Sequence, residues 1–308
     1  TLQDFVLLRH GGMPLYNMAC VVDDLSMGIT LVARGDDHMI NTAPQILIYQ
    51  ALRAPVPDFA HLPLILAPNG QKLSKRFAAV SVTEYRDAGY LPDGVLNYLA
   101  RLGWSHGDQE IFSREELIEL FSWASVGRTG ARYDLKKFEY VQAEHLRALG
   151  EDTLAELVVP FLAELDLVVE ATDRRLRAAL PYLKPRATTL KDLAEGLAYF
   201  FQETLTYDEK GRRKFLTPDR AENLRALAEV VDGDGPFTTE SLENAVKAWL
   251  EGAGLSMKDV AQAARIALTG RTQSPGLFEV MVVLGKEVSL ARLAEGARMA
   301  EGTAPDGP

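Results

Sequence analysis

Short apolar runs bounded by glycine or proline dominate the first part of the chain, up to about residue 84. They have the length and the β-branched or aromatic content of buried strands, which predicts that residues 5–35 in particular are rich in strand. The clearest runs are FVLL at 5–8, ITLVAR at 29–34 and FAHLPLIL at 59–66.

A segment with helical spacing, NTAPQILIYQAL, separates the last two of these runs. We expect this helix to begin near Asn41 or Thr42, either of which can cap it, with Pro44 in its first turn. A strand, a helix and a strand in this order predict part of an open α/β sheet. In such sheets ligands bind outside the carboxyl ends of the strands.

After residue 84 the apolar spacing becomes helical and stays so to the end of the chain. SREELIELF carries a capping box, in which Ser113 precedes Glu116 by three residues. The last 150 or so residues therefore read as a helical domain, and EGTAPDGP as a solvated tail. Later helices are expected to start at Thr189, at Thr217–Pro218, near Thr239, at Ser256 and at Ser274–Pro275.

The composition is that of a globular protein in a reducing compartment. The 308 residues exceed one ordinary core and favour two or three domains, with 47% hydrophobic and 25% charged residues. No uncharged apolar run approaches the about 20 residues that span a bilayer, and TLQDFVLLRH lacks a signal-peptide run, so we expect no membrane partner and a cytoplasmic location. The single Cys20 excludes an internal disulfide framework, and five scattered histidines predict no structural metal.

The net charge of −10 argues against nonspecific binding of polyanions over the whole surface. The cations are nevertheless bunched. Any single bunch is most simply a solvated helix face or loop. The bunches are Lys72, Lys75 and Arg76; Lys136 and Lys137; Arg174, Arg175 and Arg177; and Arg212, Arg213 and Lys214.

The loop QKLSKR, which follows the turn APNG, carries residues suited to a polyphosphate. The ammonium groups of Lys72 and Lys75 can close over the phosphates and stabilise the charge on a leaving pyrophosphate. Ser74 adds a hydroxyl donor. Taken alone, this short lysine pattern is weak, and an exposed basic loop is the simpler interpretation.

Arg34 and Tyr16 are the other candidates for binding. Arg34 ends a strand-like run and precedes GDDH, and at the carboxyl end of a strand a guanidinium can hold a carboxylate through two hydrogen bonds. The alternative is a structural Arg34 paired with Asp36 or Asp37. Tyr16 could lend its hydroxyl to the same ligand, but the sequence alone favours an ordinary core tyrosine.

Together, in this order and at this spacing, these segments resemble bacterial glutamyl-tRNA synthetase, a class I aminoacyl-tRNA synthetase. The resemblance runs from the first residue to about residue 295. The segments that carry it are DFVLLRHGGMPLYN, VVDDLSMGIT, ARGDDH, NTAPQILIYQAL, FAHLPLIL, KLSKR, VSVTEYRDAGYLPDGVLNYLARLGWSHGDQEIFSREELIELF and ALTGRTQSPGLFEVMVVLGKE.

The resemblance implies the ATP-dependent attachment of glutamate to tRNA-Glu through glutamyl-adenylate, with Mg²⁺ accompanying ATP. KLSKR would be the class I Lys-Met-Ser-Lys-Ser loop. In that loop Lys75 would stabilise the transition state of adenylate formation, Lys72 would assist, and Ser74 would match the loop serine.

The resemblance also implies where the substrates bind. Arg34 and Tyr16 would contact glutamate, Arg34 through the side-chain carboxylate of the substrate. Asp37 and His38 would lie beside the bound nucleotide.

The implied fold class is α/β plus all-α, in three parts. Residues 1–83 would be the second half of the class I catalytic (Rossmann) domain, 84–150 a helical stem-contact region and 151–308 an α-helical anticodon-binding domain. Glutaminyl-tRNA synthetases carry β-barrels in the last part, so a helical reading favours the glutamyl enzyme.

The chain departs from the family pattern in three places. Phe77 and Ala78 follow KLSKR where the family usually has histidine and glycine, Pro44 stands where an arginine is common, and no His-x-Gly-His motif occurs. The segment that grips the tRNA acceptor end is not found either. We therefore expect a fragment, a remnant or one half of a split enzyme with a separate amino-terminal half, inactive in adenylate formation alone. The alternative is a non-catalytic tRNA-binding or regulatory relative.

Overall fold

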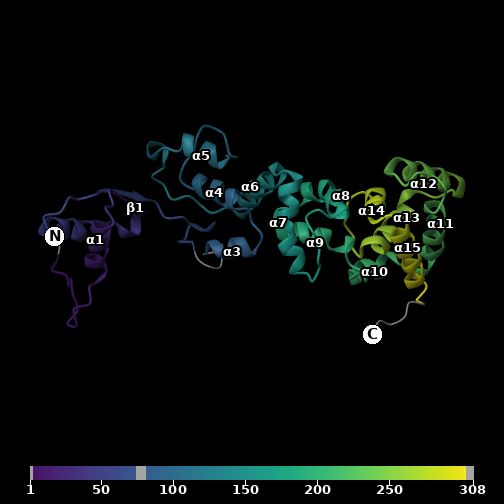
Figure 1. Cartoon of the computed structure of the whole chain (residues 1–308), viewed down its shortest axis with the longest axis horizontal. Coiled ribbons are helices and arrows are strands. Elements are labelled where there is room, and N and C mark those ends of the chain that lie inside the picture. Colours follow the sequence, from purple (N-terminus) through teal and green to yellow (C-terminus); the bar gives the residue numbers. More distant parts are fainter. Residues whose placement is uncertain (1–2, 74–80, 303–308) are drawn as a thin grey trace. The chain divides into compact units, whose positions relative to one another are not determined.

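The computed structural model describes residues 3–73 and 81–302, and the chain divides into two compact units (Figure 1). The first unit comprises Thr1–Glu84 and Pro92–Val141, and the second, here called the helical unit, comprises Tyr85–Leu91 and Gln142–Pro308. The expected domain boundaries after residues 83 and 150 stay predictions. In the part of the chain described, no helix is both long and apolar enough to cross a bilayer.

A parallel strand–helix–strand element forms the α/β part of the first unit. Strand β1 (Leu31–Gly35) pairs in parallel with β2 (Asp58–Leu62), and helix α2 (Met39–Ala51) connects them. This arrangement confirms the expected partial α/β fold. In the observed register Arg34 lies opposite His61, so both side chains sit near the carboxyl edge of the strand pair.

The expectation that residues 5–35 are mostly strand is wrong for α1 (Tyr16–Ser26). Met18, Val21 and Leu25 of this helix pack on α2, in a cluster with Ile48. Their spacing of three and four residues places them on one helix face, a period that short apolar runs conceal. Before α1, the described residues from Gln3 onward form no named strand, and an isolated antiparallel bridge joins Leu8 to Pro14.

Helix α2 begins at Met39, two or three residues before the expected caps. A 3₁₀ turn at Asp36–His38 leads directly into it. The hydroxyl of Thr42 is engaged in contacts with other side chains and does not cap the helix. Pro44 consequently lies in the second turn and not in the first.

The remaining helices up to residue 148 carry the expected local signals. Ser113 caps α5: its hydroxyl accepts from the Glu116 amide at 3.1 Å, and its own amide donates to the Glu116 carboxylate at 2.7 Å, which confirms the capping box. The helices are α3 (Val82–Asp87), α4 (Pro92–Arg101), α5 (Arg114–Leu120) and α6 (Leu135–Ala148).

The helical unit contains no strand among its described residues, which confirms the all-α prediction for this part. One continuous apolar core runs through its helices. They are α7 (Glu151–Ala163), α8 (Arg174–Leu183), α9 (Leu190–Leu197), α10 (Glu209–Phe215), α11 (Pro218–Val231), α12 (Thr239–Ala253), α13 (Met257–Thr269), α14 (Leu277–Leu284) and α15 (Lys286–Ala300).

Four of the five predicted helix starts in this unit are confirmed, and the fifth is early. Helix α14 begins at Leu277, after Gly276, and not at Ser274–Pro275. The hydroxyl of Ser274 accepts from Arg265 at 2.9 Å, while Glu279 accepts from the Gly276 amide at 2.7 Å and so marks the true start.

Arg292 of α15 ties separate segments of the helical unit together. It is 9% exposed and donates to the carbonyl oxygens of Leu268 at 2.7 Å and Gln202 at 2.8 Å. A buried guanidinium that satisfies two carbonyl groups is costly to remove, because the carbonyls would lose their donors.

Candidate active site

Polar side chains gather at the carboxyl ends of β1 and β2. Nη2 of Arg34 donates to Oγ1 of Thr42 at 2.9 Å, and the same oxygen lies 2.9 Å from Nε2 of His61. The ring of Phe59 packs against both ends of this chain of contacts: its centroid lies 5.5 Å from the Arg34 guanidinium carbon and 6.5 Å from the stacked His61 ring. Thr42 and Phe59 therefore contact the Arg34 side chain directly, and His61 supports it through both of them.

The guanidinium of Arg34 keeps donors for a ligand. Its Nε is buried and has no hydrogen-bond partner among the residues that the structure describes. Such an orphaned donor calls for an acceptor, and a carboxylate fits the planar fork of a guanidinium best. Neither Asp36 nor Asp37 forms an ion pair with Arg34 within residues 3–73 and 81–302, so the structural pairing considered above does not hold there.

Tyr16 lies at the surface and faces His38. Its hydroxyl is 3.1 Å from Nδ1 of His38, and the two ring centroids are 5.8 Å apart. With 51% of its surface exposed, Tyr16 is not a core tyrosine. Two of the predicted ligand-binding residues are thus brought into direct contact.

Cys20 lies one turn after Tyr16 on α1 and interacts with both Tyr16 and Arg34. Burial raises the pKa of its thiol, with a further contribution from Asp24, while Arg34 and Tyr16 act on it in the opposite direction. Both predicted glutamate contacts, Arg34 and Tyr16, therefore act on the same thiol.

Lys72 and Asp37 form an ion pair, with Nζ and Oδ2 3.1 Å apart. The hydrogen bond from Lys72 lowers the pKa of the Asp37 carboxyl. Lys72 is the last predicted catalytic residue before the undescribed segment 74–80, so Ser74 and Lys75 lie outside the described residues.

Thr42 and His61 are members of this site that the sequence did not reveal. Thr42 was expected only as a helix cap, and His61 only as part of a strand. The one available signal was a single histidine within the apolar run FAHLPLIL, eight residues long and otherwise uncharged.

A second group of polar side chains lies in the helical unit, around Tyr199. This residue is 2% exposed, its hydroxyl has no hydrogen-bond partner among the described residues, and burial raises its pKa. Arg186 and Arg271 act on it electrostatically and also line a cavity of about 180 Å³. Burial, and then the charge of Arg186, lower the pKa of Arg265. Asp192 and Glu195 line the same cavity, so two arginines and two acidic side chains meet there.

The predicted cationic clusters of the helical unit are partly used for structure. Arg175 donates to the carbonyl of Phe200 at 2.8 Å, and Arg177 pairs with Asp152 at 2.7 Å. Arg212 and Arg213 both pair with Glu209. Lys214, in contrast, lies over the ring of Phe215 at 5.1 Å and has no acidic partner in the described part of the unit.

Two family descriptions together account for most of the chain. Residues 1–140 match the catalytic domain of class I tRNA synthetases (E and Q), and residues 153–297 match an anticodon binding domain. The predicted site at β1 and β2 falls in the first match, and the arginine group around Tyr199 falls in the second.

Curated and solved relatives agree with both matches. The glutamate–tRNA ligase of Desulfosudis oleivorans is 45% identical over 296 residues, which cover 96% of this chain and 63% of the relative. That of Syntrophobacter fumaroxidans is 47% identical over 298 residues, with the same coverage. The crystal structure of a glutamate tRNA ligase from Elizabethkingia meningosepticum in complex with its amino acid superposes with a TM-score of 0.80 at 31% identity, covering 96% of this chain and 62% of that one.

The chain thus spans about 63% of the length of its curated relatives. Sequence, fold and domain order point to one family, and the chain belongs to the glutamate–tRNA ligases, class I aminoacyl-tRNA synthetases.

Proposed function

We propose that the protein containing this chain attaches glutamate to tRNA-Glu in the cytoplasm. Glutamate and ATP would give glutamyl-adenylate and pyrophosphate, and the glutamyl group would then move to the terminal ribose of the tRNA. The observation that carries the proposal is the Arg34 guanidinium, held by Thr42 at the carboxyl end of β1 with unpartnered donors left over.

Arg34 would bind the side-chain carboxylate of glutamate. The guanidinium offers two parallel hydrogen bonds to a carboxylate, and its charge rejects the neutral amide of glutamine. Tyr16, beside His38, would donate its hydroxyl to the same substrate. Thr42 and His61 would fix the direction of the guanidinium and so limit the length of substrate that fits.

ATP would bind beside Asp37 and His38. In this proposal the triphosphate competes with Asp37 for the ammonium group of Lys72, which lies only 3.1 Å from the carboxylate. Lys75 and Ser74 would act on the phosphates as pyrophosphate leaves. Mg²⁺ would enter with the ATP phosphates as part of the substrate, as is usual for this ion.

The helical unit would read the anticodon of tRNA-Glu. An anticodon loop presents unpaired bases and phosphates, so a reader needs cations together with surfaces for stacking. Arg186 and Arg271 around their cavity, and Lys214 over Phe215, supply cations of this kind.

Glutamate-dependent exchange of pyrophosphate into ATP tests the proposed activity. Because the chain spans about 63% of its relatives, the assay uses this chain joined to the part of the Desulfosudis oleivorans ligase that lies outside the matched segment. We expect exchange with glutamate and little with glutamine or aspartate. A control chimera has the same junction but carries the matched segment of the Syntrophobacter fumaroxidans ligase in place of this chain. Its activity shows whether the junction itself is tolerated.

A folded, soluble chimera that binds tRNA-Glu but exchanges no pyrophosphate would contradict ligase activity, provided the control chimera is active. That result would instead favour the non-catalytic tRNA-binding relative.

A further inference from the structure

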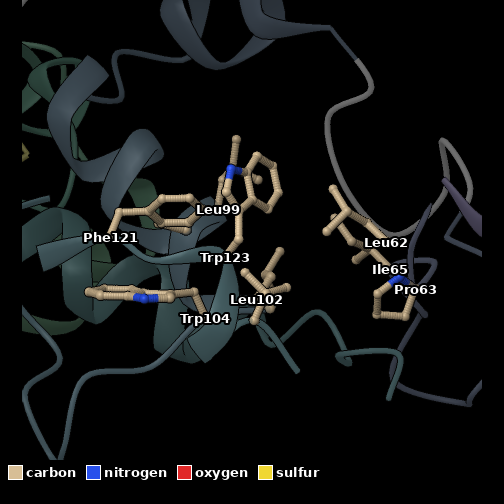
Figure 2. A pocket seen from close by; sticks show the side chains of 11 residues that line it. Leu62, Pro63, Ile65, Leu99, Leu102, Trp104, Phe121 and Trp123 are labelled. Carbon is tan, nitrogen blue, oxygen red and sulfur yellow. The ribbon is translucent and has the colours of Figure 1, made fainter. Parts of the chain in front are cut away.

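An apolar hollow of about 220 Å³ lies within the first unit, between the end of β2 and the region of α4 and α5 (Figure 2). One wall consists of Leu62, Pro63 and Ile65, and the facing wall includes Leu99, Leu102, Trp104, Phe121 and Trp123. The volume is below the about 300–1,000 Å³ of pockets for drug-sized ligands, so the hollow suits a single ring system.

The two walls are fixed to each other through the backbone. The amide of Leu66 donates to the carbonyl of Ala131 at 2.8 Å, and the amide of Tyr133 donates to the carbonyl of Leu66 at 2.7 Å. On the aromatic wall, the amide of Gly127 donates to the carbonyl of Gly103 at 2.7 Å. The hollow is therefore built by bonded segments and does not depend on side-chain packing alone.

Trp123 presents an indole ring that is available to a ligand. It is 50% exposed, in a 3₁₀ turn that Ser122 caps. The edge-to-face contact with Phe121, at 5.4 Å between centroids, steadies the ring without covering it fully. Exposed tryptophan in a rigid turn is a suitable platform for stacking.

A polar hollow of about 440 Å³ continues from the apolar one. The two share Leu62, Pro63, Trp123 and Val126, and the polar hollow adds Arg128 together with Asp36 and His61. Arg128 is exposed and has no carboxylate partner among the described residues. Trp123 and the Arg128 guanidinium thus border one continuous groove, whose lining also includes hydrogen-bonding groups.

We propose that this groove binds one unpaired nucleotide of an RNA, with the base stacked on Trp123 and the phosphate held by Arg128. The pairing of an aromatic platform with a nearby cation is the usual chemistry of single-stranded nucleic-acid sites. Asp36 and His61 can meet the base edge or the ribose hydroxyls, which an apolar peptide side chain would leave unpaired. The inference rests on the proposed function, since the RNA in question is the tRNA substrate.

The affinity of this chain for a tRNA-Glu transcript, measured by filter binding at several salt concentrations, tests whether the groove binds RNA. Trp123→Ala and Arg128→Ala should each weaken binding by about tenfold, the effect of losing one stacked base or one phosphate contact. Trp123→Phe keeps a ring and should stay within about twofold of the unaltered chain. Arg128→Ala should also reduce the slope of log affinity against log salt by about 1.

Two matched variants control for general effects on the surface. Tyr140→Ala removes an aromatic side chain that is 47% exposed on α6, and Arg9→Ala removes an exposed arginine, neither of which lines the groove. Both should bind as the unaltered chain does. The tRNA should quench tryptophan emission in these controls and quench it less in Trp123→Phe.

The outcomes separate this inference from the function on which it rests. If the Trp123 and Arg128 variants bind tRNA-Glu normally while an anticodon-substituted tRNA binds less well, the groove is not an RNA site and the proposed function stands. If AMP alone quenches Trp123 and tRNA does not, the groove belongs to a free nucleotide and the assignment is overturned. If the unaltered chain binds no tRNA, the groove is not an RNA site of this chain, whereas the proposed function is decided separately by pyrophosphate exchange in the chimera.

Discussion

Replacing Arg34 by alanine should separate glutamate binding from ATP binding. The substitution removes the guanidinium whose Nε is unpartnered and whose Nη2 is held by Thr42 at 2.9 Å. Each hydrogen bond to a charged group contributes about 1.5–3 kcal/mol, so two such bonds to a half-buried carboxylate contribute about 3 kcal/mol at the lower limit. This corresponds to an increase of about a hundredfold in the KM for glutamate.

The KM for ATP should hardly change, because the nucleotide is assigned to the side of Asp37 and His38. Arg34→Lys should restore little, since a point charge does not reproduce the two parallel bonds of a guanidinium. The fold should tolerate Arg34→Ala, because Thr42 keeps His61 as a partner at 2.9 Å.

Thr42→Val tests whether the direction of the guanidinium matters in addition to its charge. Valine has nearly the shape of threonine but lacks the hydroxyl that joins Arg34 to His61. We expect the KM for glutamate to rise by about tenfold, the cost of one hydrogen bond, with Arg34 still present. Thr42→Ser, which keeps the hydroxyl, should recover most of the loss.

These values are measured by pyrophosphate exchange in the chimera with the Desulfosudis oleivorans segment, with glutamate and ATP varied separately. An equal rise of both KM values in Arg34→Ala would assign Arg34 a structural role and refute the reasoning. Thermal unfolding followed by circular dichroism identifies any variant whose kinetics reflect misfolding.

Three further predictions concern other residues. Lys75→Ala in the chimera should slow glutamate activation by about a hundredfold or more with little change in the KM for glutamate, and an unchanged rate would remove Lys75 from the mechanism. The hydrogen bond from Lys72 lowers the pKa of Asp37, so the stabilisation from this pair is present above the ordinary value of 3.8 and is lost as pH falls through the lowered folded-state value. Lys72→Ala should raise the Asp37 pKa in an NMR titration, whereas an unmoved pKa would exclude the pair in solution. Arg292→Met should destabilise the helical unit by about 3 kcal/mol in urea unfolding, because the carbonyl groups of Leu268 and Gln202 lose their donor. Replacing the exposed Arg174 by methionine should change the stability little. Equal effects of the two substitutions would contradict the buried role of Arg292.

The sequence predicts those parts of the fold that depend on local signals. The strand–helix–strand order, the Ser113 capping box and the helical unit are predicted correctly because turn residues, caps and apolar spacing act over a few residues. Helix α1 is missed since its apolar face, Met18 and Val21, becomes evident only once α2 lies against it.

The active site shows the same limit. The position of Arg34 after a strand predicts a ligand-binding edge without knowledge of the tertiary structure. Its contact with Thr42 and His61 depends on the parallel register that sets Arg34 opposite His61, and no local signal fixes that register. The electrostatic interactions among Arg186, Arg265 and Tyr199 likewise involve segments far apart in the sequence.

Charging of tRNA-Glu with radiolabelled glutamate by the chimera tests the account most directly, because it requires both the site at β1 and β2 and the helical unit. We predict ATP-dependent charging of tRNA-Glu, and clearly slower charging of a transcript whose anticodon is substituted. A folded chimera that charges neither transcript, while the control chimera with the Syntrophobacter fumaroxidans segment charges tRNA-Glu, would contradict the assignment of glutamate–tRNA ligase activity to this chain.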